Sequence, residues 1–212
     1  MADLTHVSAQ GLTQGLTGLR RSPLAHLAGR LAAASDPSPA SSASLAAVPF
    51  VSMVSLRVDP ASPAAARVAA VLGGPLPTAC GEVTGTISSD AIWLGPDEWL
   101  VVATTDSVAL ADQLTAAIGD DAGLALDVSA NRTILELAGP SARAVLEKGC
   151  PVDLHPRAFG PGNAVSTTLA RVPVLLWQTG DDTYRLLPRS SFADYVARWL
   201  LDAMTEFTEF TR

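Results

Sequence analysis

The chain has 212 residues, enough for one large domain or two small ones, and its formal net charge is -7. Only 17% of the residues are charged, against about a quarter in an average globular protein, which favours a surface partly covered by partners. The acidic balance and the scattered basic residues argue against nucleic-acid binding.

The two cysteines, Cys80 and Cys150, have no metal-ligand spacing, so the sequence supports no zinc site and fits a reduced, intracellular chain. No apolar stretch approaches the roughly 18 residues that a membrane-spanning helix needs. We therefore expect a cytoplasmic protein without membrane contact.

Residues 1–49 predict an N-terminal arm that contains a short helix and a linker. Ser22-Pro23 is typical of a helix start, and leucines follow with helical spacing at 24, 27 and 31. The glycine spacing of GLTQGLTG at 11–18 does not match a phosphate-binding loop and favours a flexible segment. Residues 35–49, rich in Ser, Ala and Pro, predict a flexible linker.

Residues 50 to about 120 predict a first unit in the order strand, helix, strand, strand, helix. Strands are indicated by alternating exposure patterns, and helices by apolar spacing on one side. The elements are a strand from Phe50, a helix at 64–72 opened by Pro63, at least one strand within 82–94, a strand at 98–104, and a helix at 108–118 capped by Asp106.

Residues from about 124 to 204 predict a second unit with the same order. Its elements are a strand at 131–138, a helix at 142–148, strands at 164–170, 172–177 and 184–187, and a helix at 191–204. The expected apolar face of the last helix consists of Phe192, Tyr195, Val196, Trp199 and Leu200.

A shift of 85 positions places the second unit on the first without a gap. It aligns Ile92 with Trp177, Gly95 with Gly180, Trp99 with Tyr184, Val101-Val102 with Leu186-Leu187, and Leu114 with Trp199. We therefore predict an α+β fold of two duplicated βαββα units. The two units would face each other, so that each covers a sheet face that the other cannot bury alone. They form one domain at 50–204, followed by a tail at 205–212.

Candidate catalytic groups have competing structural interpretations. Cys150 and His155 are close enough for a thiol nucleophile and its base, but a preceding helix C-terminus disfavours a thiolate, so a buried structural cysteine is favoured. The pairs Asp97-Glu98 and Asp181-Asp182 occupy predicted turns, where backbone hydrogen bonding favours Asp.

Asp127 and Arg132 flank the entrance to a strand of the second unit, where we expect a structural ion pair, although a functional role stays open. Phe159-Gly160-Pro161-Gly162 predicts a rigid turn with too few backbone donors for an anion nest. The four tryptophans, at 93, 99, 177 and 199, pack in the core, anchor a partner interface, or do both.

Five segments together resemble a known family. They are RSPL at 21–24, WLGPDEWLV at 93–101, DVSANRTILELAGPSAR at 127–143, GCPVDLHPRAF at 149–159 and RSSFADYVARWLLDA at 189–203. The chain from about residue 20 to 203 resembles the gamma subunit of heterotetrameric sarcosine oxidase. Two segments depart from the pattern: FGPG at 159–162, where the family suggests FPPG, and the terminal TEFTEFTR, which we interpret as a frayed tail or a cloning remnant.

The resemblance implies the folate-binding fold of aminomethyltransferases, in agreement with the predicted repeat. It also implies a bacterial complex of alpha, beta, gamma and delta chains that oxidises sarcosine, with tetrahydrofolate and oxygen, to glycine, 5,10-methylenetetrahydrofolate and hydrogen peroxide. In that family FAD, FMN and NAD are bound by the alpha and beta chains, zinc by delta and tetrahydrofolate by alpha. We therefore expect no cofactor in this chain.

These observations together predict a non-catalytic subunit that stabilises a sarcosine oxidase complex by docking chiefly on its alpha chain. We assign it no catalytic, cofactor-binding or metal-binding residue. The candidates for the partner interface are Arg21, Ser22, Pro23, Leu24, Trp93 and Trp99. The alternatives are a stand-alone folate-binding aminomethyltransferase-like protein, in which Asp127 would contact a pterin ring, and an acidic adaptor module.

Overall fold

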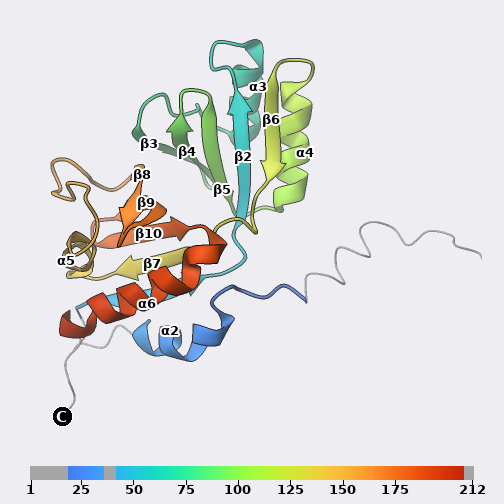
Figure 1. The fold of residues 1–212 in the computed structure, drawn as a ribbon. Helices are drawn as coiled ribbons and strands as arrows, with labels where there is room; N and C mark the ends of the chain where they lie inside the picture. Colours follow the sequence, from blue (N-terminus) through green and yellow to red (C-terminus); the bar gives the residue numbers. More distant parts are fainter. Residues whose placement is uncertain (1–18, 36–41, 208–212) are drawn as a thin grey trace, which may run out of the picture.

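The computed structural model describes residues 19–35 and 42–207, in which helices cover one curled antiparallel sheet (Figure 1). The first half of the sheet comes from residues 52–127. Its elements are β2 (Ser52–Val58), α3 (Pro63–Leu72), β3 (Gly81–Gly85), β4 (Ser89–Gly95), β5 (Glu98–Ala103), α4 (Ser107–Ile118) and β6 (Gly123–Asp127).

The second half combines a strand from the N-terminal region with residues 134–207. Its elements are η1 (Ala25–Leu27), α2 (Ala28–Ala34), β1 (Ser44–Val48), β7 (Ile134–Ala138), α5 (Ala142–Glu147), β8 (Asn163–Leu169), β9 (Val172–Gly180), β10 (Thr183–Pro188), η2 (Ser190–Phe192), α6 (Ala193–Ala203) and η3 (Thr205–Phe207). The mixture of helices and antiparallel strands confirms the predicted α+β class.

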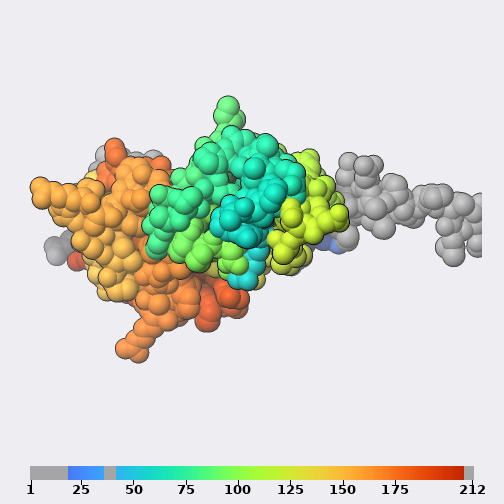
Figure 2. Space-filling view, turned by 90° about the horizontal axis from the view of Figure 1, so that it is seen from above, coloured from blue at the N-terminus to red at the C-terminus, as the bar shows by residue number. Residues whose placement is uncertain are grey.

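The ten strands follow one another in the order β1-β7-β10-β9-β8-β3-β4-β5-β2-β6. The halves meet at the centre, where β3 pairs with β8 through Gly81 opposite Ala164 and Glu82 opposite Asn163. Seen from above, the first half, coloured cyan to yellow, lies directly against the orange second half (Figure 2). The two halves therefore form one continuous body, as the sequence predicts.

Three apolar clusters hold this body together. Helices α3 and α4 cover one face of the first half, where Val68, Trp99 and Leu114 are buried. Helices α2, α5 and α6 contribute to a second cluster on the second half. A third cluster, which includes Met53 and Trp177, joins the inner faces of the two halves.

Several local signals produce the elements that the sequence predicts. Pro63 begins α3, and Gly73 ends it with a left-handed φ of 77°, a conformation that glycine adopts without steric cost. The Asp106 carboxylate caps α4 by accepting hydrogen bonds from the backbone N–H groups of Val108 and Ala109. These caps satisfy backbone groups that a helix end leaves unpaired.

The predicted linker is wrong at residues 44–48, which form the edge strand β1. This strand pairs with β7 in antiparallel register, from Ser44 opposite Ala138 to Val48 opposite Ile134. Its Leu45 side chain is fully buried. A composition of Ser, Ala and Val does not exclude a strand when a neighbouring strand supplies hydrogen bonds and a core. Residues 36–41 of the predicted linker, and the glycines at 11–18, lie outside the described residues.

The predicted apolar face of α6 is partly wrong. Val196 and Leu200 are buried as expected, but Phe192 and Tyr195 are exposed. The helix instead buries Ala193, Ala197 and Ala203 beside the two larger residues. Trp199, the remaining residue of the predicted face, is half-buried and packs against the same cluster.

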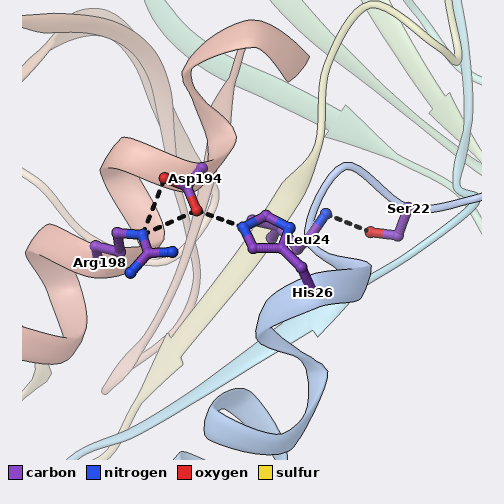
Figure 3. A network of polar contacts seen from close by, with 5 residues as sticks. All are labelled: Ser22, Leu24, His26, Asp194 and Arg198. Carbon is purple, nitrogen blue, oxygen red and sulfur yellow. Dashed lines mark hydrogen bonds and ion pairs between the residues drawn. The ribbon is translucent and has the colours of Figure 1, made fainter.

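The N-terminal helix packs on the second half of the sheet. Leu24, Leu27 and Leu31 are buried in the same cluster as residues of α6. On the surface, His26 Nε2 lies 2.6 Å from Asp194 Oδ1 on α6, and Asp194 also accepts from Arg198 (Figure 3). This described part of the predicted arm is therefore integrated into the fold.

The first residues of the predicted tail also contact the body. Phe207 packs against the core of the second half, and its carbonyl oxygen accepts a hydrogen bond from the Ser42 N–H at 3.1 Å. The Lys148 ammonium pairs with Glu206 and lies 4.8 Å from the centre of the Phe207 ring. Residues 208–212 lie outside the described residues. Across the described ranges, no helix is long and apolar enough to cross a membrane.

Candidate functional site

A cavity of about 250 Å³ lies where the chain crosses between the two halves. Both crossings line it: residues 48–53, which lead from β1 into β2, and residues 127–134, which lead from β6 into β7. Residues 20–23 of the N-terminal segment and Ser190 complete the wall. Four segments far apart in sequence thus converge on one site.

Asp127 contributes the carboxylate of this cavity. Its Oδ1 accepts hydrogen bonds from the Ser129 backbone N–H at 2.9 Å and from the Ser129 hydroxyl at 2.6 Å. Partial burial by itself would raise the pKa of Asp127, but hydrogen bonds from Ser129 and Ser107 and the charge of Arg20 hold that pKa below its usual value. The side chain is therefore a stable anion rather than a proton donor.

Arg132 lies in the same cavity but does not pair with Asp127. Its Nη1 donates to the Leu187 carbonyl oxygen at 2.9 Å, and no ion pair involves Arg132 within residues 19–35 and 42–207. The predicted ion pair is therefore wrong, because Asp127 is hydrogen-bonded to Ser129 and Arg132 to Leu187 instead. Burial, and then the neighbouring charge of Arg189, lower the pKa of Arg132.

Phe50 occupies the turn between β1 and β2 at the edge of the cavity. Its φ is 61°, a left-handed conformation that is uncommon for a bulky residue, and its side chain is 56% exposed. Together with Val51 and Met53 it gives the cavity an apolar side. The sequence predicts that the strand begins at Phe50, and this is wrong, because β2 begins at Ser52 and Phe50 lies in the preceding turn.

The other candidate catalytic groups have structural roles. Cys150 is buried, and burial raises the pKa of its thiol, which suits a packing role rather than a nucleophile. The nearby His155 is exposed, and its Nδ1 accepts a hydrogen bond from the Arg157 N–H at 3.2 Å. Of the residues that the structure describes, no group of three or more His, Cys, Asp or Glu side chains is placed to hold a metal.

The predicted turns are confirmed except at Glu98, which begins β5. Asp97 lies in the turn between β4 and β5, and Asp181-Asp182 lies in the turn between β9 and β10. Glu98 pairs across the strands with Arg57 at 2.5 Å. The turn before β8 is closed by the Asn163 N–H, which donates to the Gly160 carbonyl oxygen at 3.0 Å. These carboxylates and turns are explained by folding alone.

The six interface candidates fall into two groups. Leu24 and Trp99 are buried within the chain, and the Trp99 Nε1 donates to the Pro77 carbonyl oxygen at 2.9 Å, so a partner could contact little of either side chain. Trp93 is half-buried opposite Trp99. Arg21, Ser22 and Pro23 line the cavity between the halves.

Comparison with known proteins identifies the family. The model of the sarcosine oxidase, gamma subunit family matches residues 57–206, more than half of the chain. The chain belongs to the sarcosine oxidase gamma subunit family. The matched range begins near the end of β2 and ends within η3, so it covers most strands of both halves but not β1.

Named relatives extend this match over almost the whole chain. Sarcosine oxidase subunit gamma of Corynebacterium sp. (strain U-96) is 49% identical over 91% of this chain and 93% of its own length. The corresponding subunit of an Arthrobacter species is also 49% identical, over 90% of this chain and 93% of its own. The gamma subunit family pattern therefore includes the N-terminal segment as well as the sheet.

Two solved structures have a similar fold. A chain of heterotetrameric sarcosine oxidase from Corynebacterium sp. U-96, solved with pyrrole 2-carboxylate, matches with a TM-score of 0.85 and 47% identity, over 92% of this chain and 99% of that chain. Glycine cleavage system aminomethyltransferase T from Bartonella henselae matches with a TM-score of 0.56 at 16% identity, over 76% of this chain and 46% of its own. The second match shows a shared fold alone, and confirms the expected likeness to aminomethyltransferases.

Proposed function

We propose that this gamma subunit is a non-catalytic component of a heterotetrameric sarcosine oxidase and contributes to the assembly and stability of the complex. The observation that carries the proposal is the match over 99% of a chain that belongs to a heterotetrameric sarcosine oxidase. A chain that matches one subunit from end to end, at 47% identity, is expected to occupy the same place in its own complex.

The arrangement of polar groups supports a role without its own chemistry. Within residues 19–35 and 42–207 the cavity carboxylate, Asp127, is held as an anion by Ser129, and the buried thiol of Cys150 has a raised pKa. General acid–base catalysis needs a group whose pKa lies near the working pH and which reaches the reacting atom. Neither group meets this condition.

The cofactors of the reaction would then lie in the other subunits. We expect FAD, FMN, NAD, zinc and tetrahydrofolate in the alpha, beta and delta chains, and a cytoplasmic complex that converts sarcosine, tetrahydrofolate and oxygen to glycine, 5,10-methylenetetrahydrofolate and hydrogen peroxide. The alpha chain would be the chief contact of this subunit. Its own contribution to oxidation would be indirect.

We further propose that the two halves arose by duplication. The strand order β3-β4-β5-β2 of the first half has the same pattern as β8-β9-β10-β7 of the second, whereas the edge strand β6 follows its half in the chain and β1 precedes the other strands of its half. The bounds of β5 and β10 differ by 85 positions at both ends, which is the shift that the sequence suggests. The shift differs elsewhere, since α3 and α5 begin 79 positions apart.

Co-expression tests the proposed function. The tagged chain is produced with the alpha, beta and delta subunits, and the purified material is assayed for flavin absorbance and sarcosine oxidation. Recovery of a yellow, active complex is expected, and loss of that complex when this chain is omitted would establish the assembly role. Recovery of the chain alone would reject it, and folate binding by that isolated chain would favour the aminomethyltransferase-like alternative.

A further inference from the structure

The cavity between the halves has a charge opposite to that of the chain as a whole. The chain carries a formal net charge of -7, yet the cavity is lined by Arg20, Arg21 and Arg132 and by one carboxylate, Asp127. That carboxylate already accepts two hydrogen bonds from Ser129. The local excess of positive charge can therefore bind an anion that enters the cavity.

Arg132 is the cavity residue whose charge an anion would stabilise most. The guanidinium is half-buried, and Nη1 donates to the Leu187 backbone carbonyl oxygen, which leaves further N–H donors on the group. Burial and the like charge of Arg189 both disfavour its charged form. A carboxylate is the natural counterpart, because two guanidinium N–H groups can bind its two oxygens together.

One side of the cavity is apolar. Val48, Val51, Met53 and Ile134 line this side, and the Phe50 ring is exposed at its edge. The rest of the lining includes the hydroxyl side chains of Ser22, Ser52, Ser129, Thr133 and Ser190. The left-handed φ of 61° at Phe50 costs backbone energy, which a fold retains where the residue has a further role. An apolar wall beside three arginines fits a carboxylate that is carried on an apolar body.

We propose that this cavity is the docking site for a carboxylate side chain on an apolar segment of a partner subunit. The proposal rests on the proposed function and adds the site and the chemistry of the contact. Charge complementarity selects the acidic group, since three arginines and one carboxylate line the cavity. Arg20 and Arg21 are exposed at the edge, where they would meet a segment of a second chain rather than a fully enclosed small molecule.

Charge reversal tests the site in the complex. The double variant Arg20→Glu, Arg21→Glu is co-expressed with the other subunits, and the partner chains recovered with it are compared with those of the unmodified chain. We expect recovery to fall at least about tenfold, because a carboxylate would face two like charges. Arg30→Glu, an exposed change on α2 outside the cavity, is the matched control and should leave recovery unchanged.

A second variant separates docking from folding. Phe50→Gly removes the ring while it favours the left-handed backbone, so the yield of the tagged chain should hold while recovery of partner chains falls several-fold. Recovery of partner chains that stays at the level of the unmodified chain in both Phe50→Gly and the double variant would overturn the docking site while leaving the proposed function intact. Failure of the unmodified chain to recover any partner would overturn both.

Coupling chemistry identifies the occupant. Arg21→Lys places an amine at the cavity edge, and a carbodiimide then joins that amine to a carboxylate in contact with it as an amide, with loss of water. We expect mass spectrometry to find this link to an Asp or Glu of a partner subunit. A link to a second copy of this chain, a small-molecule adduct, or no link at all would overturn the assignment.

Discussion

The two halves of the sheet have similar strand orders, but their edge strands, β1 and β6, bury different side chains. β1, the edge of the second half, buries Leu45 in the cluster that contains α2. β6, the edge of the first half, turns Ala125 toward the helices and leaves Leu124 and Leu126 exposed. Because side chains alternate along a strand, a shift of one residue in the pattern decides which face receives the leucines. Equal topology therefore does not give equal burial.

Each half also contains a cross-strand ion pair, but the two pairs lie at different register positions and carry their charges on opposite strands. Arg57 on β2 pairs with Glu98 on β5, whereas in the second half Glu136 on β7 pairs with Arg185 on β10. Each pair lies directly across two neighbouring strands. What the two halves share is thus a cross-strand contact of opposite charges, irrespective of which strand carries which sign.

The largest expected effect comes from the buried aromatic residues that the 85-position shift aligns. Trp99→Ala and Tyr184→Ala each remove a side chain that is about 1% exposed, and each should cost about 3–5 kcal/mol in the free energy of unfolding. Chemical denaturation followed by circular dichroism measures both. If one variant lost structure in its own half only, the halves would be separate folding units, contrary to the continuous sheet.

A smaller effect distinguishes the two edge strands. Leu45→Ala should cost about 2–5 kcal/mol because it opens a cavity in the core, whereas Leu126→Ala should change the free energy of unfolding by no more than about 0.5 kcal/mol. The same denaturation measurement compares them, and Leu126→Ala serves as the control. A large loss in Leu126→Ala would show that the face of β6 is covered within the subunit.

A glycine tests how tightly the segment before β1 packs on the second half. In Gly139→Ala the added carbon would lie 2.6 Å from the Ser42 carbonyl oxygen, in addition to a φ of 110°. In the control Gly162→Ala, φ is 86° but no atom lies within 4 Å. Thermal unfolding should show Gly139→Ala destabilised by about 1–3 kcal/mol more than the control. Equal values would mean that Ser42 moves away freely.

The smallest effect concerns the surface contact between α6 and the N-terminal helix. Hydrogen bonding with His26 lowers the pKa of Asp194, with Arg198 adding to the shift. A lowered folded pKa contributes stability above the ordinary value of 3.8, and this contribution is lost as pH falls through the folded value. Asp194→Asn should therefore lower Tm by at most about 4 °C near pH 5. The difference should vanish at more acidic pH, and a constant difference would contradict this origin.

Much of the fold was predictable because its signals are local. Pro63 and Gly73 bound a helix, Asp106 caps another, and the turns at 95–97 and 180–182 separate strands that pair with each other. β6 was not predicted, because GLALD is a short segment with only two leucines, although the turn residues at 119–122 separate it from α4. The sequence also left open how many strands lie within 82–94, where the chain makes β3 and most of β4.

The cavity was predictable only in part. The sequence pointed to Arg21 as an interface candidate and to Asp127 and Arg132 as an ion pair, but it did not indicate that the three residues line one cavity. Neither Phe50 nor Ser129 was predicted to line a site. The cavity is formed by segments that are far apart in the sequence. A pattern within one segment therefore cannot predict that the two chain crossings lie next to the N-terminal residues.

The α+β class, most helix and strand positions, and the family could be predicted, because these depend on residue order over short distances. Three features could be found only in the folded chain: residues 44–48 complete the sheet, particular leucines of the edge strands are buried, and arginines gather at the junction of the halves. Hydrogen bonds between strands, burial and the local sum of charges depend on which distant segments become neighbours.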